Sequence, residues 1–185
     1  DNLLDIKNWK KVSDDTSEFL SQYHDIPFKG EVPENITPNS PVRNYPYYMN
    51  FAGERLLITG GGHIANRLDR PGTIMTFENN TWNSFQEEGI SEQTKHRYDD
   101  INCIVQDPKD ATHHFAASAG EGIYEFKDGK FINWYSMHNS PLESAVPNEP
   151  WADSYVRVNG LIYDKENNLW MVSCETQHAV SVLMK

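Results

Sequence analysis

The chain has 185 residues, a formal net charge of −11 and a sequence pI of about 5.0. This acidic balance, without any run of basic residues, argues against a nucleic-acid partner because phosphate binding needs a basic field. No stretch approaches the ~20 apolar residues of a membrane-spanning helix. Residues 1–5 lack signal-peptide character, but a mature secreted product would lack it too, so the compartment stays open here.

Aromatic residues make up 12% of the chain, with 5 Trp, 9 Tyr and 8 Phe, while hydrophobic residues reach only 38%. Short strands that stack large flat side chains have this profile more often than helical bundles do, so the composition predicts an all-β protein. The two cysteines, Cys103 and Cys174, lie in apolar runs. We expect two buried thiols rather than a disulfide, and neither cysteine has metal-ligand spacing.

Residues 1–45 are the least regular part, and we expect an irregular or inserted segment there. Trp9–Val12 predicts one short strand, and Ser13–Tyr23 predicts one or two helical turns. Five prolines between residues 24 and 46 exclude helix and favour an extended path.

Three groups of short strands follow, at about residues 46–90, 98–136 and 155–185. The strands that we expect are Tyr47–Phe51, Leu56–Thr59, Thr73–Phe77 and Trp82–Phe85, then Ile101–Val105, Phe115–Ser118, Ile123–Phe126 and Phe131–Tyr135, then Leu161–Tyr163, Leu169–Val172 and Ala179–Leu183. Polar turns separate them. Asn79-Asn80, Asp128-Gly129 and Asn167-Asn168 predict tight hairpins, because Asn, Asp and Gly tolerate positive φ.

Landmarks recur along the chain at similar spacing. Trp82 and Trp134 are 52 residues apart, and Asp107 and Asp164 are 57 apart. A period of this length with four short strands in each unit predicts β-propeller blades of four antiparallel strands, about three of them. The strand pattern excludes a helical solenoid, and the lack of helices between strands excludes a TIM barrel.

The propeller hypothesis makes further predictions. Blades pack face to face, so both faces of a sheet are buried and its strands need no strict alternation. We expect the small residues Ala116–Ser118 on an innermost strand, and Trp82 and Trp134 on outermost strands. About three blades cannot close a ring of roughly 4–8, so the chain is expected to be part of a larger propeller. Open sheet edges would then invite self-association.

Two segments carry a family resemblance. Ala119–Phe131 contains a Gly-Ile-Tyr step and a Lys-Asp-Gly-Lys turn, and Asp164–Val172 contains a polar turn followed by Asn-Leu-Trp. Both resemble the two-component-regulator propeller repeat of Bacteroidetes, which occurs in the periplasmic sensor region of hybrid histidine kinases and in the surface component of the type IX (Por) secretion system. Over residues ~45–185 the resemblance implies an extracytoplasmic, non-catalytic binding propeller, periplasmic or at the cell surface.

Within this family, two features favour the secretion relative. Arg70–Met75 followed by Asn80–Trp82 resembles its Pro-Gly step and tryptophan, and the last strand resembles its blade endings. In hybrid sensors Gly-Thr usually follows the Trp-Ile step of the repeat, whereas this chain has Val172-Ser173-Cys174 there, which argues against a sensor. The alternative is the ligand-sensing region of a hybrid two-component histidine kinase that recognises carbohydrate. A third class, a propeller hydrolase or lyase, has no catalytic constellation in the sequence.

The polar motifs favour structural roles. Gly60-Gly61-Gly62-His63 lacks the helix and Lys-Ser/Thr of a phosphate loop, so it predicts a turn at a blade end. The seven histidines show no paired metal spacing and are expected on the surface or in loops. Asp99, Asp100 and Asp153 are expected to be solvated turn carboxylates rather than an acid pair. We therefore expect no catalytic residue, no metal and no cofactor.

The expected functional surface is one mouth of the propeller, built from loops between strands. Arginines near an exposed ring suit a partner protein or an anionic glycan. The candidate ligand-binding residues are Arg67, Arg70, Arg97, Tyr98 and Trp151.

Overall fold

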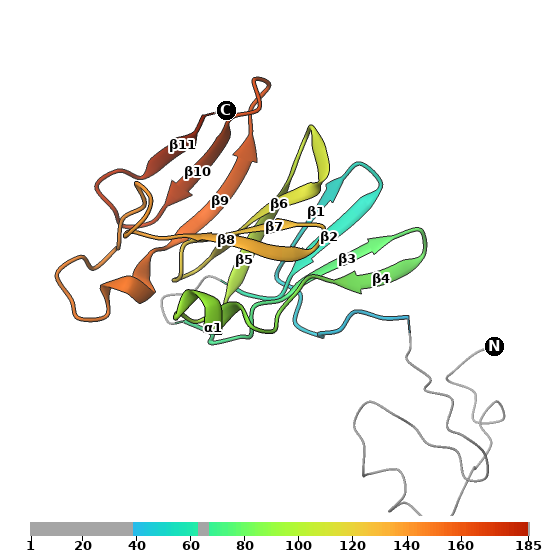
Figure 1. Ribbon diagram of the computed structural model, residues 1–185, viewed down its shortest axis with the longest axis horizontal. Coiled ribbons are helices and arrows are strands. Elements are labelled where there is room, and N and C mark those ends of the chain that lie inside the picture. The colour runs from blue at the N-terminus through green and yellow to red at the C-terminus, as the bar shows by residue number, and fades with distance from the viewer. Residues whose placement is uncertain (1–38, 63–66, 185) are drawn as a thin grey trace, which may run out of the picture. The chain divides into compact units, whose positions relative to one another are not determined.

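The computed structural model describes residues 39–62 and 67–184 (Figure 1). The chain divides into two compact units, Asp1–Asn39 and Ser40–Lys185, and every described strand lies in the second. The strand and the helical turns expected within residues 9–23 lie outside the described residues. No helix in the described part of the chain is both long and apolar enough to cross a membrane.

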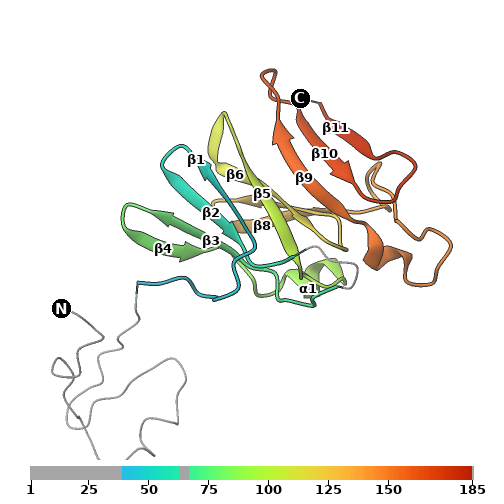
Figure 2. The same ribbon diagram turned by 180° about the vertical axis from the view of Figure 1, so that it is seen from behind.

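The second unit consists of three antiparallel sheets, each with neighbouring strands in chain order. Sheet 1 contains β1 (Tyr48–Ala52), β2 (Arg55–Thr59), β3 (Ile74–Glu78) and β4 (Thr81–Ser84); sheet 2 contains β5 (Ile101–Asp107), β6 (Asp110–Ser118), β7 (Ile123–Lys127) and β8 (Lys130–Tyr135); sheet 3 contains β9 (Val158–Tyr163), β10 (Leu169–Ser173) and β11 (Val180–Leu183). Figures 1 and 2 show the sheets standing side by side, with sheet 2 in the middle. The predicted all-β class and partial set of propeller blades are confirmed, although sheet 3 has three described strands instead of four.

Local turn chemistry explains the hairpins. Asn79 and Asn80 have φ of 51° and 59°, and Asp128 and Gly129 have φ of 52° and 72°, as expected for turns that favour these residues. In the β9–β10 hairpin, the Asp164 carboxylate accepts hydrogen bonds from the backbone N–H of Asn168 and the indole N–H of Trp170, both at 2.8 Å.

Two apolar layers hold the sheets together. Between sheets 1 and 2 the buried residues include Leu57, Ile74, Ile104, Ala116 and Tyr124. Between sheets 2 and 3 they include Cys103, Phe115, Ile123, Leu161 and Leu169. Sheet 2 is therefore buried on both faces, which is why β5 is buried at nearly every position and does not alternate between buried and exposed side chains.

The structure corrects several sequence predictions about this unit. The first strand of sheet 2, β5, contacts the first strands β1 and β9 of the two neighbouring sheets, so Ala116–Ser118 on β6 belong to a second strand and not to the innermost one. Their small side chains instead let β6 fit between two sheets. Trp82 and Trp134 lie on the outermost strands β4 and β8, as expected. Helix α1 (Ile90–Thr94) and a 3-10 helix at Ala152–Tyr155 were not predicted.

Cysteine and histidine burial also differs from expectation. Both cysteines are free thiols, but only Cys103 is buried, while Cys174 is half-buried. His114 is 1% exposed on β6, so the prediction of a surface position was wrong for it. Alternation along β6 turns this side chain into the layer beside Phe85, whose ring lies 4.9 Å from the imidazole. Burial lowers the pKa of His114 to about 4.

A candidate binding cleft above a buried ionic network

An open polar cleft lies where loops meet just before the first strands of sheets 2 and 3. Its volume is about 500 Å³, and its lining includes Asp69, Ser91, Lys95, His96, Arg97 and Asp99. The lining residues come from the loop that precedes β3, from helix α1 and the segment after it, and from the 3-10 helix before β9. The cleft therefore combines loops associated with all three sheets.

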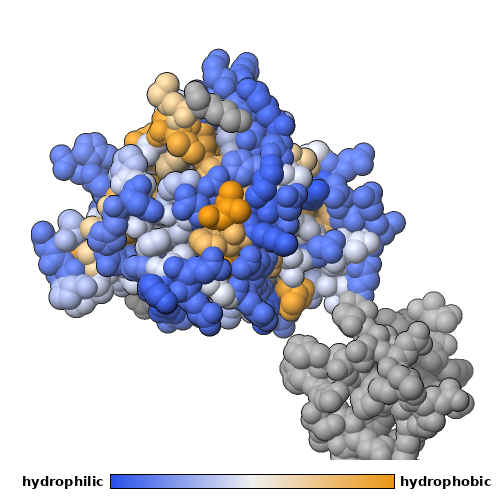
Figure 3. All heavy atoms as spheres, in the orientation of Figure 1, coloured by the Kyte–Doolittle hydropathy of each residue, from blue (hydrophilic) through white to orange (hydrophobic). Residues whose placement is uncertain are grey.

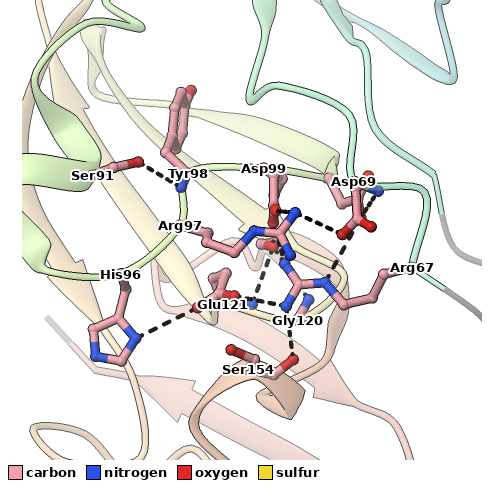
Figure 4. A network of polar contacts seen from close by, with 12 residues as sticks. Arg67, Asp69, Ser91, His96, Arg97, Tyr98, Asp99, Gly120, Glu121 and Ser154 are labelled. Atoms are coloured by element: carbon pink, nitrogen blue, oxygen red, sulfur yellow. Dashed lines mark hydrogen bonds and ion pairs between the residues drawn. The ribbon is translucent and has the colours of Figure 1, made fainter. Parts of the chain in front are cut away.

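Beneath the cleft, Arg67 joins these loops (Figure 4). One guanidinium nitrogen donates to Glu121 Oε1 at 2.7 Å and to the Ser154 carbonyl at 3.1 Å, and the other pairs with Asp99. Its side chain is only 10% exposed, and Glu121 is fully buried. Glu121 lies between β6 and β7, and Ser154 precedes β9, so one side chain connects three sheets.

Asp100 fixes the loop that carries Arg67. Its carboxylate accepts three backbone hydrogen bonds, from Leu68 at 3.1 Å and from Asp69 and Arg70 at 3.0 Å each. Asp100 is fully buried and has φ of 48°. Arg67 Nε lies 3.9 Å away, but the three backbone N–H groups are the closer partners, so this residue organises the loop.

Arg97 lies at the rim, with 53% of its side chain exposed. Its Nη2 is 2.6 Å from Asp69 Oδ1 and 2.7 Å from Asp99 Oδ2. Asp99 thus lies between Arg97 and Arg67. Burial raises the pKa of Asp99 to about 6, because the loss of solvation and the neighbouring carboxylates outweigh the two guanidinium groups.

Trp134 of β8 supports two members of this group from behind the cleft lining. Its indole N–H donates to the Glu121 carbonyl at 2.6 Å, and its ring lies 4.5 Å from the His96 ring. His96 Nδ1 is 3.7 Å from Glu121 Oε2. The outermost strand of sheet 2 therefore supports both the buried carboxylate and the imidazole at the cleft surface.

Two glycines permit the close packing around the network. A Cβ on Gly120 would lie 2.7 Å from the Ser154 carbonyl and 3.0 Å from the Arg67 guanidinium carbon. A Cβ on Gly72 would lie 2.6 Å from the Tyr98 ring. Both positions need a residue without a side chain because another group already fills the space.

The carboxylates Asp69, Asp99 and Asp100 bring oxygens within 4.8 Å of one another. Their existing partners fit a metal poorly. Asp99 already pairs with Arg67 and Arg97, and both oxygens of Asp100 accept backbone hydrogen bonds. A cation would have to displace guanidinium groups from a site where they are already well placed.

The five sequence candidates separate into three positions. Arg97 and Tyr98 line the cleft and Arg67 lies beneath it. Arg70 donates to the Gly61 carbonyl at 3.2 Å and lies over the Tyr45 ring, and it is not a lining residue. Trp151 is 55% exposed and also lies outside the lining.

Two expectations about these residues were wrong. Tyr98 is 7% exposed and packs edge-on against Tyr124, with ring centroids 4.9 Å apart, so it does not offer an exposed ring. Asp99 and Asp100 are buried rather than solvated, because Arg67 and backbone N–H groups compensate their charges. Asp153 does lie at the surface, 2.7 Å from His138.

Sequence reasoning missed Glu121, His96 and Ser154. Glu121 lies between Gly120 and Gly122, and this was the one local signal available, since glycines beside an acidic residue allow close approach of a partner. Ser154 contributes a backbone carbonyl to the network, which no side-chain pattern reveals.

Comparison with known proteins adds a fold neighbour. No protein family model and no curated protein matches the chain. The chain is similar to PorZ. The solved structure is described as an essential bacterial surface component of the type-IX secretion system of the human oral bacterium Porphyromonas gingivalis. The two share a TM-score of 0.71 and 25% sequence identity, over 81% of this chain and 20% of PorZ.

The likeness supports a PorZ-like β-propeller fold for the described sheets. The chain matches about a fifth of the length of PorZ, so the activity of the whole relative is not transferred with the fold. The more specific assignment to the two-component-regulator repeat stays a prediction.

Proposed function

We propose that this chain is a non-catalytic binding segment of an extracytoplasmic β-propeller that serves a type IX secretion complex at the cell surface. The observation that carries the proposal is its similarity to PorZ, which is itself described as a surface component of that system. The sequence resemblance noted over residues ~45–185 points the same way.

The state of the buried carboxylates supports a binding role over catalysis. A general acid or base needs an oxygen that can reach a substrate proton. Asp99 is held by two arginines, Asp100 by three backbone N–H groups, and Glu121 by Arg67. These groups serve to order the loops, and the raised pKa of Asp99 follows from its burial within this network.

The cleft is the proposed ligand site, and its rim defines the ligand chemistry. Lys95 and Arg97 bring positive charge, while Ser91 and His96 bring hydrogen-bonding groups. Such a mixture suits an anionic glycan, or an acidic loop of a partner protein, because both present charged and hydroxyl or amide groups together. Ligand binding in this view replaces Asp69 as the partner of Arg97.

Titration calorimetry with acidic oligosaccharides and with proteins secreted by the type IX system tests the proposal. We expect binding that Arg97→Gln weakens about tenfold, in line with the loss of one charge-assisted contact. Arg43→Gln is the matched control, since Arg43 is a partly exposed arginine paired with Glu87 and does not line the cleft.

The sensor alternative predicts a different result. A sensing region of a hybrid kinase would bind neutral carbohydrate fragments and no secretion component. Binding of neutral oligosaccharides that is unchanged in Arg97→Gln, with no binding of cargo or acidic glycan, would therefore reject the secretion proposal in favour of the sensor.

A further inference from the structure

A second pocket lies at the far ends of the strands that start beside the cleft. Its volume is about 500 Å³, and it is lined by β1, by the ends of β5 and β9, and by the turns after β1 and β5. The cleft lies before the starts of β5 and β9, so the length of β5, roughly 20 Å, separates the two sites. Figures 1 and 2 show the β1–β2 turn and the end of β9 on the side away from α1. We call this site the strand-end pocket.

The walls of the strand-end pocket are uncharged. None of the described residues that line it is acidic or basic, whereas the lining of the cleft includes Lys95, Arg97 and Asp99. Hydrophilic side chains cover most of the face shown in Figure 3, and the chain carries a net charge of −11, so a neutral pocket differs from its surroundings. A charged ligand would lose solvation in this pocket without gaining an opposite charge, and a neutral ligand is therefore favoured.

Three side chains of the pocket have hydrogen-bonding groups that are available to a ligand. The amide of Asn50, the amide nitrogen of Gln106 and the hydroxyl of Tyr163 have no hydrogen-bond partner among the described residues, and none of them is cut off from solvent. Arg55 donates to Gln106 Oε1 at 3.3 Å, which orients this amide so that its NH2 group stays available. Burial raises the pKa of Tyr163, and Asp107 adds to the effect, so the hydroxyl keeps its proton and can donate.

These groups fit the main chain of a peptide. Gln106 and Tyr163 can each donate to a carbonyl oxygen, and the Asn50 amide can donate and accept, as a peptide group does. Val105 and Leu161 add apolar wall for a side chain of the same segment. A saccharide would present mostly hydroxyl groups, whose protons need acceptors, and no carboxylate is found among the described lining residues. The chemistry of the pocket therefore favours a peptide over a saccharide.

We propose that the strand-end pocket binds an extended, uncharged segment of a partner protein. Gln106 and Tyr163 donate to main-chain carbonyl groups of the segment, and Asn50 pairs with one of its peptide groups. An apolar side chain of the segment packs against Val105 and Leu161. The ligand class differs from the acidic one proposed for the cleft, and binding here does not require the cleft to be occupied.

The test is an NMR titration of the whole chain, in which ¹H–¹⁵N signals report each backbone amide. The first probe is N-acetyl-leucine N-methylamide, which has two carbonyl groups, one apolar side chain and no charge. We expect saturable shifts at residues 50–53, 105–106 and 161–163, with a dissociation constant on the order of 1 mM for so small a ligand. Acetyl-Ala-Leu-Ala-amide should bind more tightly because it adds carbonyl groups. N-acetyl-leucine, which carries a free carboxylate, should bind about tenfold more weakly.

Substitutions identify the groups that bind. Tyr163→Phe and Asn50→Ala should each raise the dissociation constant about threefold to tenfold, the usual effect of one lost hydrogen bond. Tyr47→Phe and Asn83→Ala are the matched controls, because both residues are exposed and neither lines the pocket. Arg97→Gln should leave this dissociation constant unchanged, so failure here is distinguishable from failure of the function proposed for the cleft.

Three results would overturn the proposal. One is the absence of saturable shifts at the pocket residues up to ~20 mM of either neutral peptide probe, well above the expected dissociation constant. Another is a titration with cellobiose that shifts the same amides more strongly than the peptide probes do, which would make the pocket a saccharide site. The third is unchanged peptide binding in both Tyr163→Phe and Asn50→Ala, when their remaining signals show that each variant is folded.

Discussion

Replacing Arg67 by Met tests the ionic network directly. The guanidinium group donates to Glu121 at 2.7 Å and to the Ser154 carbonyl at 3.1 Å, and it pairs with Asp99. Met fills a similar volume without charge. The substitution therefore leaves Glu121, which has no exposed surface, and Asp99, which is 4% exposed, without this partner.

Removing one member of a buried ion pair typically costs about 3–5 kcal/mol, because the remaining charge stays desolvated. Arg97 still faces Asp99 at 2.7 Å, so we expect the lower part of this range, about 3 kcal/mol. Combining Arg67→Met with Glu121→Gln removes the stranded charge. This double variant should recover about 1–2 kcal/mol relative to Arg67→Met alone.

Urea unfolding followed by tryptophan fluorescence measures these differences in the free energy of unfolding. Arg43→Met serves as the control, since its pair with Glu87 is partly exposed and should contribute no more than about 1 kcal/mol. A loss below about 1 kcal/mol for Arg67→Met, or no recovery in the double variant, would refute the account of the network as a buried, compensated cluster.

Three further predictions follow from single residues. Burial lowers the pKa of His114 to about 4, below its value of about 6.5 in an unfolded chain, so the free energy of unfolding should fall as the pH drops from about 6.5 to 4, by up to ~1.4 kcal/mol per pH unit. The difference in urea midpoint between wild type and His114→Phe isolates this effect, since the raised pKa of Asp99 acts in the opposite direction in both proteins. Asp164→Ala should lower the melting temperature more than Asp164→Asn, because Asn keeps one acceptor for the Trp170 indole, and equal melting temperatures of the two variants would contradict this role. Hydrogen bonds from Trp170 and Asn168 lower the pKa of Asp164, so the contribution of Asp164 to stability should be present above about pH 4 and lost below it. Burial raises the pKa of Cys103 to about 12, so Ellman's reagent should modify only half-buried Cys174 in the folded chain and both thiols in urea, and rapid labelling of Cys103 in Cys174→Ser would contradict its burial.

The sequence predicted most of the sheet structure because hairpins depend on local chemistry. Asn79-Asn80 and Asp128-Gly129 select their turns through positive φ, and those turns set the pairing of the strands on either side. The position of Ala116–Ser118 within its sheet was beyond such reasoning. Small residues fit an innermost strand and a strand packed between two sheets equally well, and only the three-dimensional order separates them.

The candidate site was predictable only in part, for a related reason. Arg97 and Tyr98 were placed at the cleft, but the burial of Asp99 depends on Arg67, which is 32 residues away in the sequence. Glu121 is 54 residues from the same arginine. No local pattern indicates such pairs, so an acidic turn next to an arginine was interpreted as solvated when it is the centre of a buried network.

The network also separates residues that can respond to a ligand from residues that cannot. Arg97 is 53% exposed and its partner Asp69 is 58% exposed, so exchanging this contact for a ligand anion should cost no more than about 1 kcal/mol. Displacing Arg67 would instead leave buried Glu121 without a guanidinium partner and Asp99 with Arg97 alone. We therefore expect Arg97→Gln to weaken binding with little change in urea midpoint, and Arg67→Met to reduce stability before it affects the ligand. A fall in stability for Arg97→Gln as large as that for Arg67→Met would show that the rim and the buried network are one structural unit, and that ligand recognition lies elsewhere on the chain.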